Sequence, residues 1–460
     1  MQDGRRYRYY PSPEEAQTFA QWIGCVRAVY NGKDTEEQYL NWLRRYAKFS
    51  ARSFAPDEGE SEFTFDQAYS HLKPDKTTAP WFHAVPPQLY RNAMYQRNQA
   101  WQKHWKDPGT VGRPGRRKKG ENDSILLTKE LFQFWGSGLV LVGTEQRFVG
   151  VIEYREHRGV TAEPNSMTIS RDTCNRWWVS FTFDDGIKVK SDEEILQELD
   201  ALSDEELMEA TAGHDRGIVQ QVTSSDGRVY GYTEAKQRAF AKYQRRVKAL
   251  QKKMARQKDK KSARRRKTKL KLAKTQAHIK DLRVDHAHQI SHRIVGTPKS
   301  ILAFENLKLQ NMTASAKGTA EEPGKNVAAK SGLNRSLLHQ GLGRILQYVR
   351  YKAARAGKLV VLVPPQNTSR RCSRCGHTEE ANRHGIHFHC LKCGHEAHAD
   401  ANASDNIQLE GVRTVLTALG RGAAQPFAEA TKGMTITVHP AGAVEASRSP
   451  RLAALAARRG

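Results

Sequence analysis

The chain has 460 residues, and its 75 lysines and arginines outnumber its 49 aspartates and glutamates, which leaves a formal net charge of +26. This length predicts roughly two to four domains rather than one core. So large a positive excess makes a nucleic acid the expected partner and argues against a charge that serves solubility alone. No apolar run approaches the ~20 residues that span a bilayer, so we expect a cytoplasmic protein without a membrane partner.

The N-terminal segment predicts one strand followed by a helix. Arginine and tyrosine alternate through residues 6–9, as in a strand with two different faces. Residues 12–15, Ser-Pro-Glu-Glu, combine an N-cap, a proline at the first helical position and a capping-box glutamate. Apolar residues from Phe19 to Tyr30 then recur at helical spacing, which indicates packing inside an α-helical domain.

A second helix is expected over residues 87–105, where aromatic, basic and amide side chains are mixed. Gln88 and Asn92 on this helix are candidates for reading base edges, because amides pair well with adenine, although a polar outer face explains them equally well. The glycine-rich, basic segment 109–120 is either a linker or a loop that contacts phosphates.

Short β-prone runs follow the basic loop, at residues 139–142, 148–152 and 177–182. Their length and spacing predict a small antiparallel barrel. Residues 191–210 are acidic and helical, with a capping box that begins at Ser203. Because this charge repels a phosphate backbone, we interpret the segment as a solvated connector.

The most concentrated positive charge lies between residues 242 and 283, where 19 lysines and arginines face only two aspartates. Leucine and isoleucine at helical spacing predict a long basic helix or a helical hairpin. A solvated face is the alternative, but so dense a field is costly without a polyanion, which favours contact with nucleic acid. The candidate nucleic-acid contacts along the whole chain are Gln88, Asn92, Arg116, Arg117, Arg245, Arg246, Lys252, Lys253, Arg264, Arg265, Arg266 and Lys267.

Two copies of a Cys-x-x-Cys-Gly-His turn predict a zinc ribbon. They supply Cys372 and Cys375, then Cys390 and Cys393, with a span between them that suits a β-hairpin. Paired thiolates at this spacing are typical of one tetrahedral Zn²⁺. Four thiolates fill the coordination shell, so we expect a structural role and no chemistry at this ion. The histidines that offer an alternative ligand are His377, His387, His389 and His395.

Three acidic residues at strand-like boundaries are the candidate catalytic groups. Asp215 lies in a predicted strand that a turn and a returning strand follow. Glu305 ends the apolar run 300–304, and Asp400 follows the ribbon. Each alone is better explained as a local hydrogen-bonding or capping residue. Together they offer the hard oxygen ligands that suit a pair of Mg²⁺ ions in phosphodiester hydrolysis.

The order of these motifs resembles the transposon-encoded TnpB proteins and the related compact type V CRISPR effectors. The matching stretches are RYRYYPSPEEAQ, the basic run, AFENL, LQYVRYKAARAGKLVVLVPPQNTSRRCSRCG and CGHEAHADANASDNI, of which the last is the most specific. They span most of the chain. The resemblance implies an RNA-guided DNA endonuclease that recognises a short motif beside its target and pairs a guide RNA with the DNA.

The resemblance also implies the fold class and its segments. It predicts a multidomain α/β protein with an RNase H-like RuvC nuclease domain and an inserted zinc ribbon, an antiparallel β-barrel wedge domain and an α-helical recognition domain. The expected segments are 1–11 (first strand of the wedge barrel), 12–110 (helical recognition domain), 111–188 (wedge barrel), 189–365 (RuvC domain with basic helices), 366–397 (zinc ribbon), 398–420 (last RuvC segment) and 421–460 (flexible tail).

In the same way, the resemblance assigns the metals and the partners. Asp215, Glu305 and Asp400 would be the catalytic ligands of two Mg²⁺, with Asp215 bridging both ions. Guide RNA, two Mg²⁺ and one Zn²⁺ are the expected cofactors, and double-stranded DNA is the expected target. A monomer or a homodimer is the expected assembly, in prokaryotic cytoplasm and associated with the nucleoid.

One departure from the family pattern lies beside a catalytic position, because His214 stands where the first motif usually has an apolar residue. All three carboxylates are nevertheless present, which is not expected of a degenerate relative that no longer cuts. An RNA-guided repressor that binds DNA without cleaving it is the main alternative function. A transposase that transfers DNA strands is the other alternative.

Overall fold

The computed structural model describes residues 2–46, 69–121, 123–144, 147–316, 318 and 324–421. The chain divides into two compact units, Met1–Ile187 with Lys253–Lys274, and Lys188–Lys252 with Thr275–Gly460, here called the first and the second unit. The segment predicted as a flexible tail begins at residue 421, and all of it after that residue lies outside the described residues. None of the described helices is long and apolar enough to cross a membrane.

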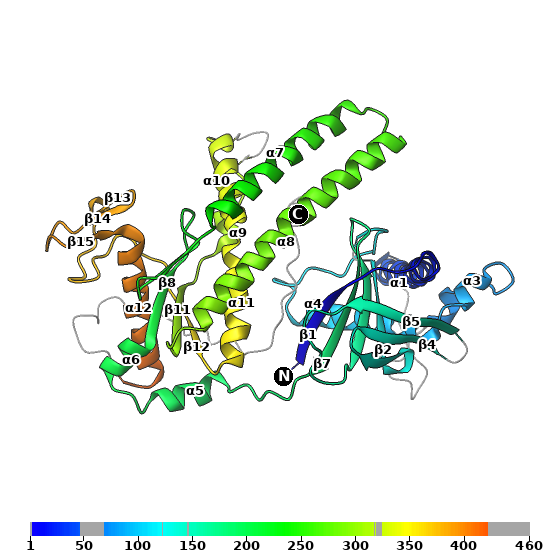
Figure 1. The fold of residues 1–460 in the computed structure, drawn as a ribbon, viewed down its shortest axis with the longest axis horizontal. Helices are drawn as coiled ribbons and strands as arrows, with labels where there is room; N and C mark the ends of the chain where they lie inside the picture. The colour runs from blue at the N-terminus through cyan, green and yellow to red at the C-terminus, as the bar shows by residue number, and fades with distance from the viewer. Residues whose placement is uncertain are drawn as a thin grey trace. The chain divides into compact units, whose positions relative to one another are not determined.

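The first unit is built on a seven-stranded antiparallel sheet with the order β2-β6-β7-β1-β5-β4-β3 (Figure 1). The N-terminal strand lies inside the sheet because it pairs with β7 on one side and with β5 on the other. The three predicted β-prone runs fall in β4, β5 and β7, whereas closure of the sheet into a barrel stays a prediction. The strands are β1 (Gln2–Tyr9), β2 (Asp123–Thr128), β3 (Phe132–Gly136), β4 (Leu139–Thr144), β5 (Arg147–Arg155), β6 (Ser166–Arg171) and β7 (Trp177–Asp184).

Two long helices of the first unit confirm the predictions for its N-terminal part. Helix α1 (Pro13–Tyr46) begins at the predicted capping box, where Glu15 N–H donates to Ser12 Oγ at 3.2 Å and Ser12 N–H donates to Glu15 Oε2 at 2.7 Å. Helix α4 (Pro87–Lys106) covers the second predicted helix. The short elements of this unit are η2 (Ser70–Leu72), α3 (Pro80–His83) and η3 (Lys129–Leu131).

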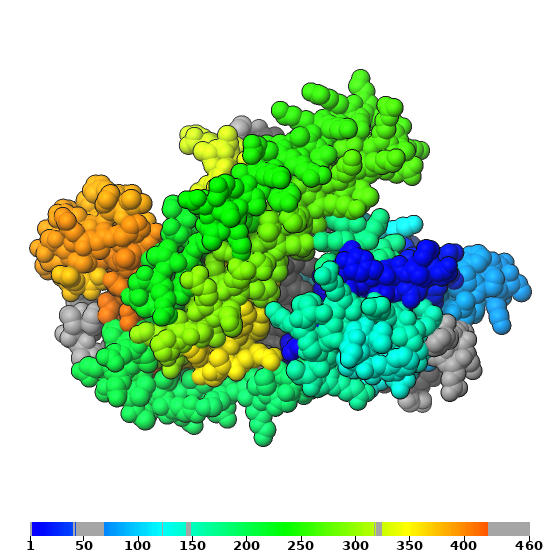
Figure 2. Space-filling view, in the orientation of Figure 1, coloured from blue at the N-terminus to red at the C-terminus, as the bar shows by residue number. Residues whose placement is uncertain are grey.

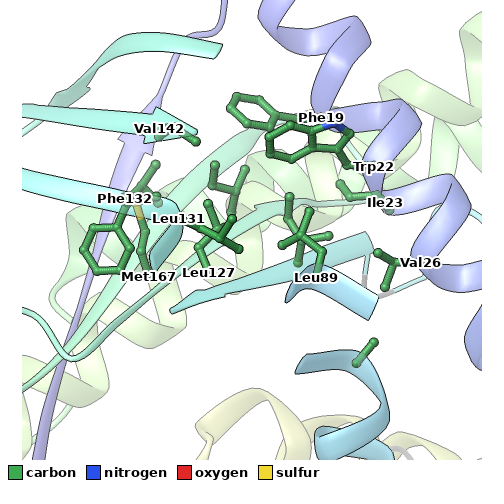
Figure 3. Packing of buried hydrophobic residues seen from close by; sticks show 14 of the residues in the cluster. Phe19, Trp22, Ile23, Val26, Leu89, Leu127, Leu131, Phe132, Val142 and Met167 are labelled. Carbon is green, nitrogen blue, oxygen red and sulfur yellow. The ribbon is translucent and has the colours of Figure 1, made fainter. Parts of the chain in front are cut away.

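The core of the first unit lies between these helices and the sheet. Tyr7 and Tyr9 of β1 are buried, while the arginines that alternate with them stay more exposed, as expected of a strand with one face in the core. Phe19 and Trp22 of α1 and Leu89 of α4 pack into the same cluster, against apolar residues of the strands (Figure 3). Helical periodicity and strand alternation therefore meet in one core.

The second unit contains a five-stranded mixed sheet with the order β10-β9-β8-β11-β12. Strands β8, β11 and β12 are parallel, and β9 and β10 continue the sheet in antiparallel fashion. The predicted strand, turn and returning strand after residue 213 correspond to β8 to β10. The strands are β8 (Thr211–Asp215), β9 (Val222–Ser224), β10 (Val229–Tyr230), β11 (Ile301–Glu305) and β12 (Leu359–Val363).

Helices cover both faces of this mixed sheet (Figure 1). Helices α5 (Asp192–Leu199), α6 (Asp204–Ala210) and α12 (Ala399–Ala418) bury one face. Helices α8 (Ala263–Val295) and α11 (Leu342–Arg355) bury the other, and α9 (Leu309–Met312) and α10 (Val327–Gln340) precede α11 in the chain.

The acidic segment that we interpreted as a solvated connector forms α5 and α6, and that interpretation was wrong. Ile195, Leu199 and Leu207 are buried against the sheet, so only the acidic side of these helices faces solvent. The helices begin at two capping boxes, at Ser191 and, as predicted, at Ser203. A short amphipathic helix hides its few apolar positions among many charges, which is why composition alone was misleading.

The basic run forms two helices, α7 (Glu234–Arg256) and α8, which confirms the predicted hairpin. Lys236 of α7 lies 3.4 Å from Asp285 Oδ2 and 3.2 Å from His286 Nδ1 of α8. Figure 2 shows the side chains of α7 on the visible surface, in green. Most of the lysines and arginines of this hairpin therefore remain exposed.

A small three-stranded antiparallel sheet, β13-β14-β15, is formed by two strands between the cysteine pairs and a third strand after the second pair. A predicted β-hairpin is thereby confirmed as β13 and β14, and β15 leads directly into α12. The elements are η4 (Glu380–Asn382), β13 (Arg383–His384), β14 (His387–His389) and β15 (Glu396–His398).

Candidate active site and zinc centre

Asp215 and Glu305 are the last residues of β8 and β11, two parallel strands that pair side by side. His214 pairs with Phe304 in the register of the two strands, and Asp215 and Glu305 are the next residues of these strands, so the two carboxylates lie side by side at the strand ends. Because side chains alternate along a strand, Asp215 and Glu305 project to the face opposite His214 and Phe304. Ala303, two residues before Glu305, packs with the residues of α12, which places both carboxylates on the face that α12 covers.

Helix α12 brings Asp400, in its first turn, to the same face of the sheet. Two glycines allow the helix to lie very close to the strands. A methyl group placed on Gly213 would lie 2.1 Å from the carbonyl oxygen of Ser404, and one on Gly411 would lie 2.5 Å from Ala303 Cβ. Larger residues at these positions would push α12 outward, so the glycines set how near Asp400 comes to the strand ends.

The three carboxylates are close enough to influence one another. Burial, and then the negative charges of Glu305 and Asp400, raise the pKa of Asp215 to about 7. Burial also raises the pKa of Glu305, against the opposing effect of a hydrogen bond from Thr368 and of nearby arginines. Such mutual repulsion is the condition that a bound cation relieves.

The donor set at these strand ends fits a hard divalent cation, because it consists of carboxylate oxygens on one face of a sheet. Within the part of the chain that the structure describes, the group of three or more side chains placed to hold one ion together is the cysteine cluster.

The four cysteines form a compact cluster, with all sulfurs within 4.8 Å of one another. Cys372 Sγ lies 3.7 Å from Cys393 Sγ, and Cys375 Sγ lies 3.5 Å from Cys390 Sγ. Both turns end in a glycine with a positive φ, as the repeated Cys-x-x-Cys-Gly pattern requires. The cluster includes none of the alternative histidines, so its donor set fits one tetrahedral zinc ion held by four thiolates.

Comparisons with known proteins match the segments that contain these carboxylates and cysteines. Family models match residues 1–32 ("Helix-turn-helix domain"), 187–316 ("Probable transposase") and 343–407 ("Cas12f1-like, TNB domain"). A relative from Escherichia coli K12, named "Putative RNA-guided DNA endonuclease InsQ", is 30% identical over 340 residues, which are 73% of this chain and 77% of the relative. The chain belongs to the TnpB-like family.

Two further matches extend over most of this TnpB-like chain. A relative from Streptomyces pristinaespiralis, named "Putative RNA-guided DNA endonuclease", is 26% identical over 414 residues and covers 88% of this chain and 89% of its own. A solved structure described as "Cryo-EM structure of the Cas12f1-sgRNA-target DNA complex" matches with a TM-score of 0.50 and 14% identity, over 86% of this chain and 83% of that one. At this identity, the second match shows a shared fold.

One matched description differs from the structure of the TnpB-like chain. The segment described as a helix-turn-helix, residues 1–32, forms strand β1 and the first part of α1. The Cas12f1-like segment agrees better, because it contains all four cysteines and Asp400.

Three residues beside the carboxylates were not predicted from the sequence. Arg383 of β13 donates from Nη2 to Asp400 Oδ1 at 3.3 Å, and it lies between the cysteine pairs, where a lone arginine carries no signal. Thr368 donates a hydrogen bond to Glu305 Oε1. Arg216 donates to the carbonyl oxygen of Glu305, and its position directly after Asp215 was the one available hint.

His214 is fully buried below the sheet, on the face away from the carboxylates. Its ring stacks on Phe304 with centroids 4.7 Å apart, and among the described residues neither ring nitrogen has a hydrogen-bond partner. Burial lowers the pKa of His214 to about 4. The uncharged side chain therefore packs in the apolar layer, at the position that is usually apolar in the family motif, and it does not reach the face of the sheet that carries the carboxylates.

The predicted nucleic-acid contacts on the hairpin lie mainly on exposed helix surfaces. Arg265 is the exception, because its guanidinium donates to the carbonyl oxygens of Met254 and Gln257 at the end of α7. Its first role is thus to join the two helices at their turn. The exposed members of the group are Arg245, Arg246, Lys252, Lys253, Arg264, Arg266 and Lys267.

The predicted contacts in the first unit have more varied surroundings. Asn92 is buried and donates to the carbonyl oxygen of Leu126 at 3.0 Å, so we no longer regard it as a reader of base edges. Gln88 is half-buried, and Arg117 stacks on the ring of Tyr30, with its guanidinium carbon 3.9 Å from the ring centroid. Arg116 is exposed, and its hydrogen bond to Thr35 ties the basic loop to α1.

Proposed function

We propose that this TnpB-like protein is an RNA-guided DNA endonuclease whose RuvC-type centre consists of Asp215, Glu305 and Asp400. The observation that carries the proposal is the convergence of these three carboxylates, from two strand ends and a helix start, on one face of the second unit's sheet. The names of the relatives support the same activity, since InsQ is named an RNA-guided DNA endonuclease.

The three carboxylates would hold two Mg²⁺ ions beside the scissile phosphate. When bound, these ions supply the charge that activates water and stabilises the leaving oxygen. Thr368 fixes one oxygen of Glu305, which leaves the other free to bind metal. Arg383 lies beside Asp400 and offers a positive charge where negative charge grows on the phosphate.

Guide RNA and double-stranded DNA are the proposed partners. The exposed arginines and lysines of α7 and α8 would neutralise phosphates, while pairing with the guide would supply sequence specificity. We also propose that the zinc ribbon interrupts the RuvC domain, and that the first unit comprises the recognition helices and the wedge sheet. Their predicted boundaries, from residues 1–11 through 398–420, stand as proposals.

Neither alternative function has a specific observation in its favour. A guided repressor is expected to lose at least one carboxylate, and this chain keeps three at one site. Strand transfer finds support only in the description "Probable transposase" of one matched family model. Cleavage of guide-matched DNA separates all three activities, because a repressor cuts nothing and a strand-transferring enzyme joins DNA ends.

The test uses protein produced with its flanking locus and a guide-matched duplex that carries randomised flanking bases. We expect Mg²⁺-dependent cleavage that EDTA abolishes, and we expect Asp400→Ala to lose nearly all of it while still binding matched DNA. Asp405→Asn is the matched control, because this acidic residue lies on the same helix outside the proposed centre. Tight guided binding without cleavage under any flank or ion would establish the repressor instead.

A further inference from the structure

Helix α12 carries a row of polar side chains that do not face the sheet. Asn402, Asn406 and Glu410 are four residues apart, so they follow one another along a single side of the helix. All three are buried, and the two asparagines are completely inaccessible. Buried amides are costly unless their donors and acceptors are satisfied, so their partners indicate what they do.

The partners of the two asparagines lie in the short segment 368–373 that leads into the zinc ribbon. Asn406 Nδ2 donates to the carbonyl oxygens of Thr368 at 2.8 Å and Arg371 at 2.7 Å. Asn402 Nδ2 donates to the same Arg371 oxygen at 2.8 Å, and Asn402 Oδ1 accepts the Ser373 N–H at 3.0 Å. The Arg371 carbonyl thus receives two amide donors from one helix.

The side chain of Arg371 completes the connection in the opposite direction. Its Nε donates to Asn406 Oδ1 at 3.3 Å, and its Nη1 donates to Glu410 Oε1 at 2.6 Å. Glu410 also pairs with Arg413 on the helix, at 3.0 Å. Main chain and side chain of the same residue are therefore both held by α12, in a fixed orientation.

Segment 368–373 touches both proposed metal sites. At one end, the Thr368 hydroxyl donates to Glu305 Oε1, while the Thr368 carbonyl is held by Asn406. At the other end, Arg371 directly precedes Cys372, whose sulfur belongs to the cysteine cluster. The helix that holds this segment also carries Asp400. A displacement at the cysteines would consequently move Glu305 and Asp400 relative to each other.

We propose that Asn402 and Asn406 are positioning residues that couple the zinc-folded ribbon to the placement of Glu305 and Asp400, and thereby set the affinity of the catalytic centre for divalent metal. The inference rests on the proposed function of the carboxylates. It assigns no contact with substrate to either asparagine. Because coupling between two sites is reciprocal, metal at the carboxylates should also slow the loss of zinc.

The test measures Mn²⁺ binding to the full-length, zinc-loaded protein without RNA, from the electron paramagnetic resonance signal of free Mn²⁺. Loss of a supporting hydrogen bond around metal ligands typically weakens metal binding by about 10- to 100-fold. We expect this weakening in Asn406→Ala and, independently, in Thr368→Val, which is nearly isosteric and removes the hydroxyl donor to Glu305. The double variant should bind Mn²⁺ no more weakly than the weaker single variant, since both act through one connection.

Thr414→Ala serves as the matched control, because among the described residues its hydroxyl bonds only to the carbonyl of Glu410 on its own helix. It should bind Mn²⁺ like the parent. A second readout is the rate at which a chelator removes zinc from the protein. Mn²⁺ should slow this rate at least about threefold in the parent, and it should have no effect on the rate in Asn406→Ala.

Failure of the inference and failure of the proposed function give different results. If Asp400→Ala binds Mn²⁺ as well as the parent does, the carboxylates are not the metal site and the proposed function itself is refuted. If binding depends on Asp400 but Asn406→Ala, with zinc retained, has the parent's affinity, the coupling is refuted. If Asn406→Ala loses zinc through misfolding, Thr368→Val decides, and parent-like Mn²⁺ binding in that variant overturns the proposal.

Discussion

Replacing His214 by leucine should stabilise the second unit. The imidazole is fully buried in the apolar layer, and neither of its nitrogens has a partner among the described residues. A buried polar group without a hydrogen bond costs about 1–3 kcal/mol, and the replacement removes two such atoms. The opposing loss is the stack on Phe304, worth about 0.5–1.5 kcal/mol. Subtracting the stack from the two unpaired nitrogens gives an expected gain of about 0.5–5.5 kcal/mol in the free energy of unfolding.

Differential scanning calorimetry of the full chain at pH 7.5 measures this gain. For a unit of this size, each kcal/mol shifts the unfolding temperature by about 2–4 °C, so the transition of the second unit should rise by about 1–22 °C. His214→Ala is the matched control, because it removes the same two nitrogens but leaves a cavity, and it should be less stable than His214→Leu by about 2–5 kcal/mol.

A lower unfolding temperature for His214→Leu would refute this reasoning. Such a result would mean that the ring nitrogens are satisfied after all, for example by a buried water with partners of its own. The imidazole would then be a structural hydrogen-bonding residue, and the buried water would explain why a polar side chain occupies a position that is usually apolar in the family.

Three other perturbations test separate parts of the structure. Gly213→Ala should force α12 away from the sheet at Ser404, which should lower the free energy of unfolding by about 1–3 kcal/mol and abolish cleavage. Gly332→Ala is the control, because its methyl group would lie in open space, and it should have neither effect in the same melting and cleavage assays. Cys375→Ser should remove zinc from the purified protein, and unchanged metal content would contradict the four-thiolate site. Burial lowers the pKa of His286 to about 4, so this side chain is neutral in the folded protein and binds a proton more readily when the chain unfolds. Lowering the pH from 6.5 to 4 should therefore reduce the unfolding temperature of the parent more steeply than that of His286→Gln. Equal slopes of unfolding temperature against pH would contradict this.

Local signals predicted the elements of this protein well. The Ser12 capping box marks the start of α1, and the apolar run before Glu305 is a buried strand of the mixed sheet. The repeated cysteine turns predicted their cluster because a Cys-x-x-Cys-Gly turn needs only neighbouring residues to form. In each case the signal lies within a few neighbouring positions, even where the resulting contact joins distant residues, as between Cys372 and Cys393.

Contacts between distant segments were not predictable in the same way. Asn92 was a candidate for reading bases because its helix is amphipathic and polar, but its amide bonds to a strand more than thirty positions away. Arg383 gains its significance from Asp400, which the ribbon sheet and the start of α12 bring beside it. Asn402 and Asn406 look like ordinary helix residues until segment 368–373 is placed against them.

The position of the zinc ribbon in the chain gives a physical reason for the proposed coupling between a metal at the cysteines and the carboxylates. Strand β15 ends at His398 and α12 begins at Ala399, so the ribbon continues without a linker into the helix that carries Asp400. The Ala399 N–H also donates to the carbonyl of Ile386, at 2.8 Å, inside the ribbon. Asp400 is therefore held from two directions, by the ribbon before it and by the close approach of α12 to Gly213 after it. An insertion that carried only a separate binding surface would need neither constraint.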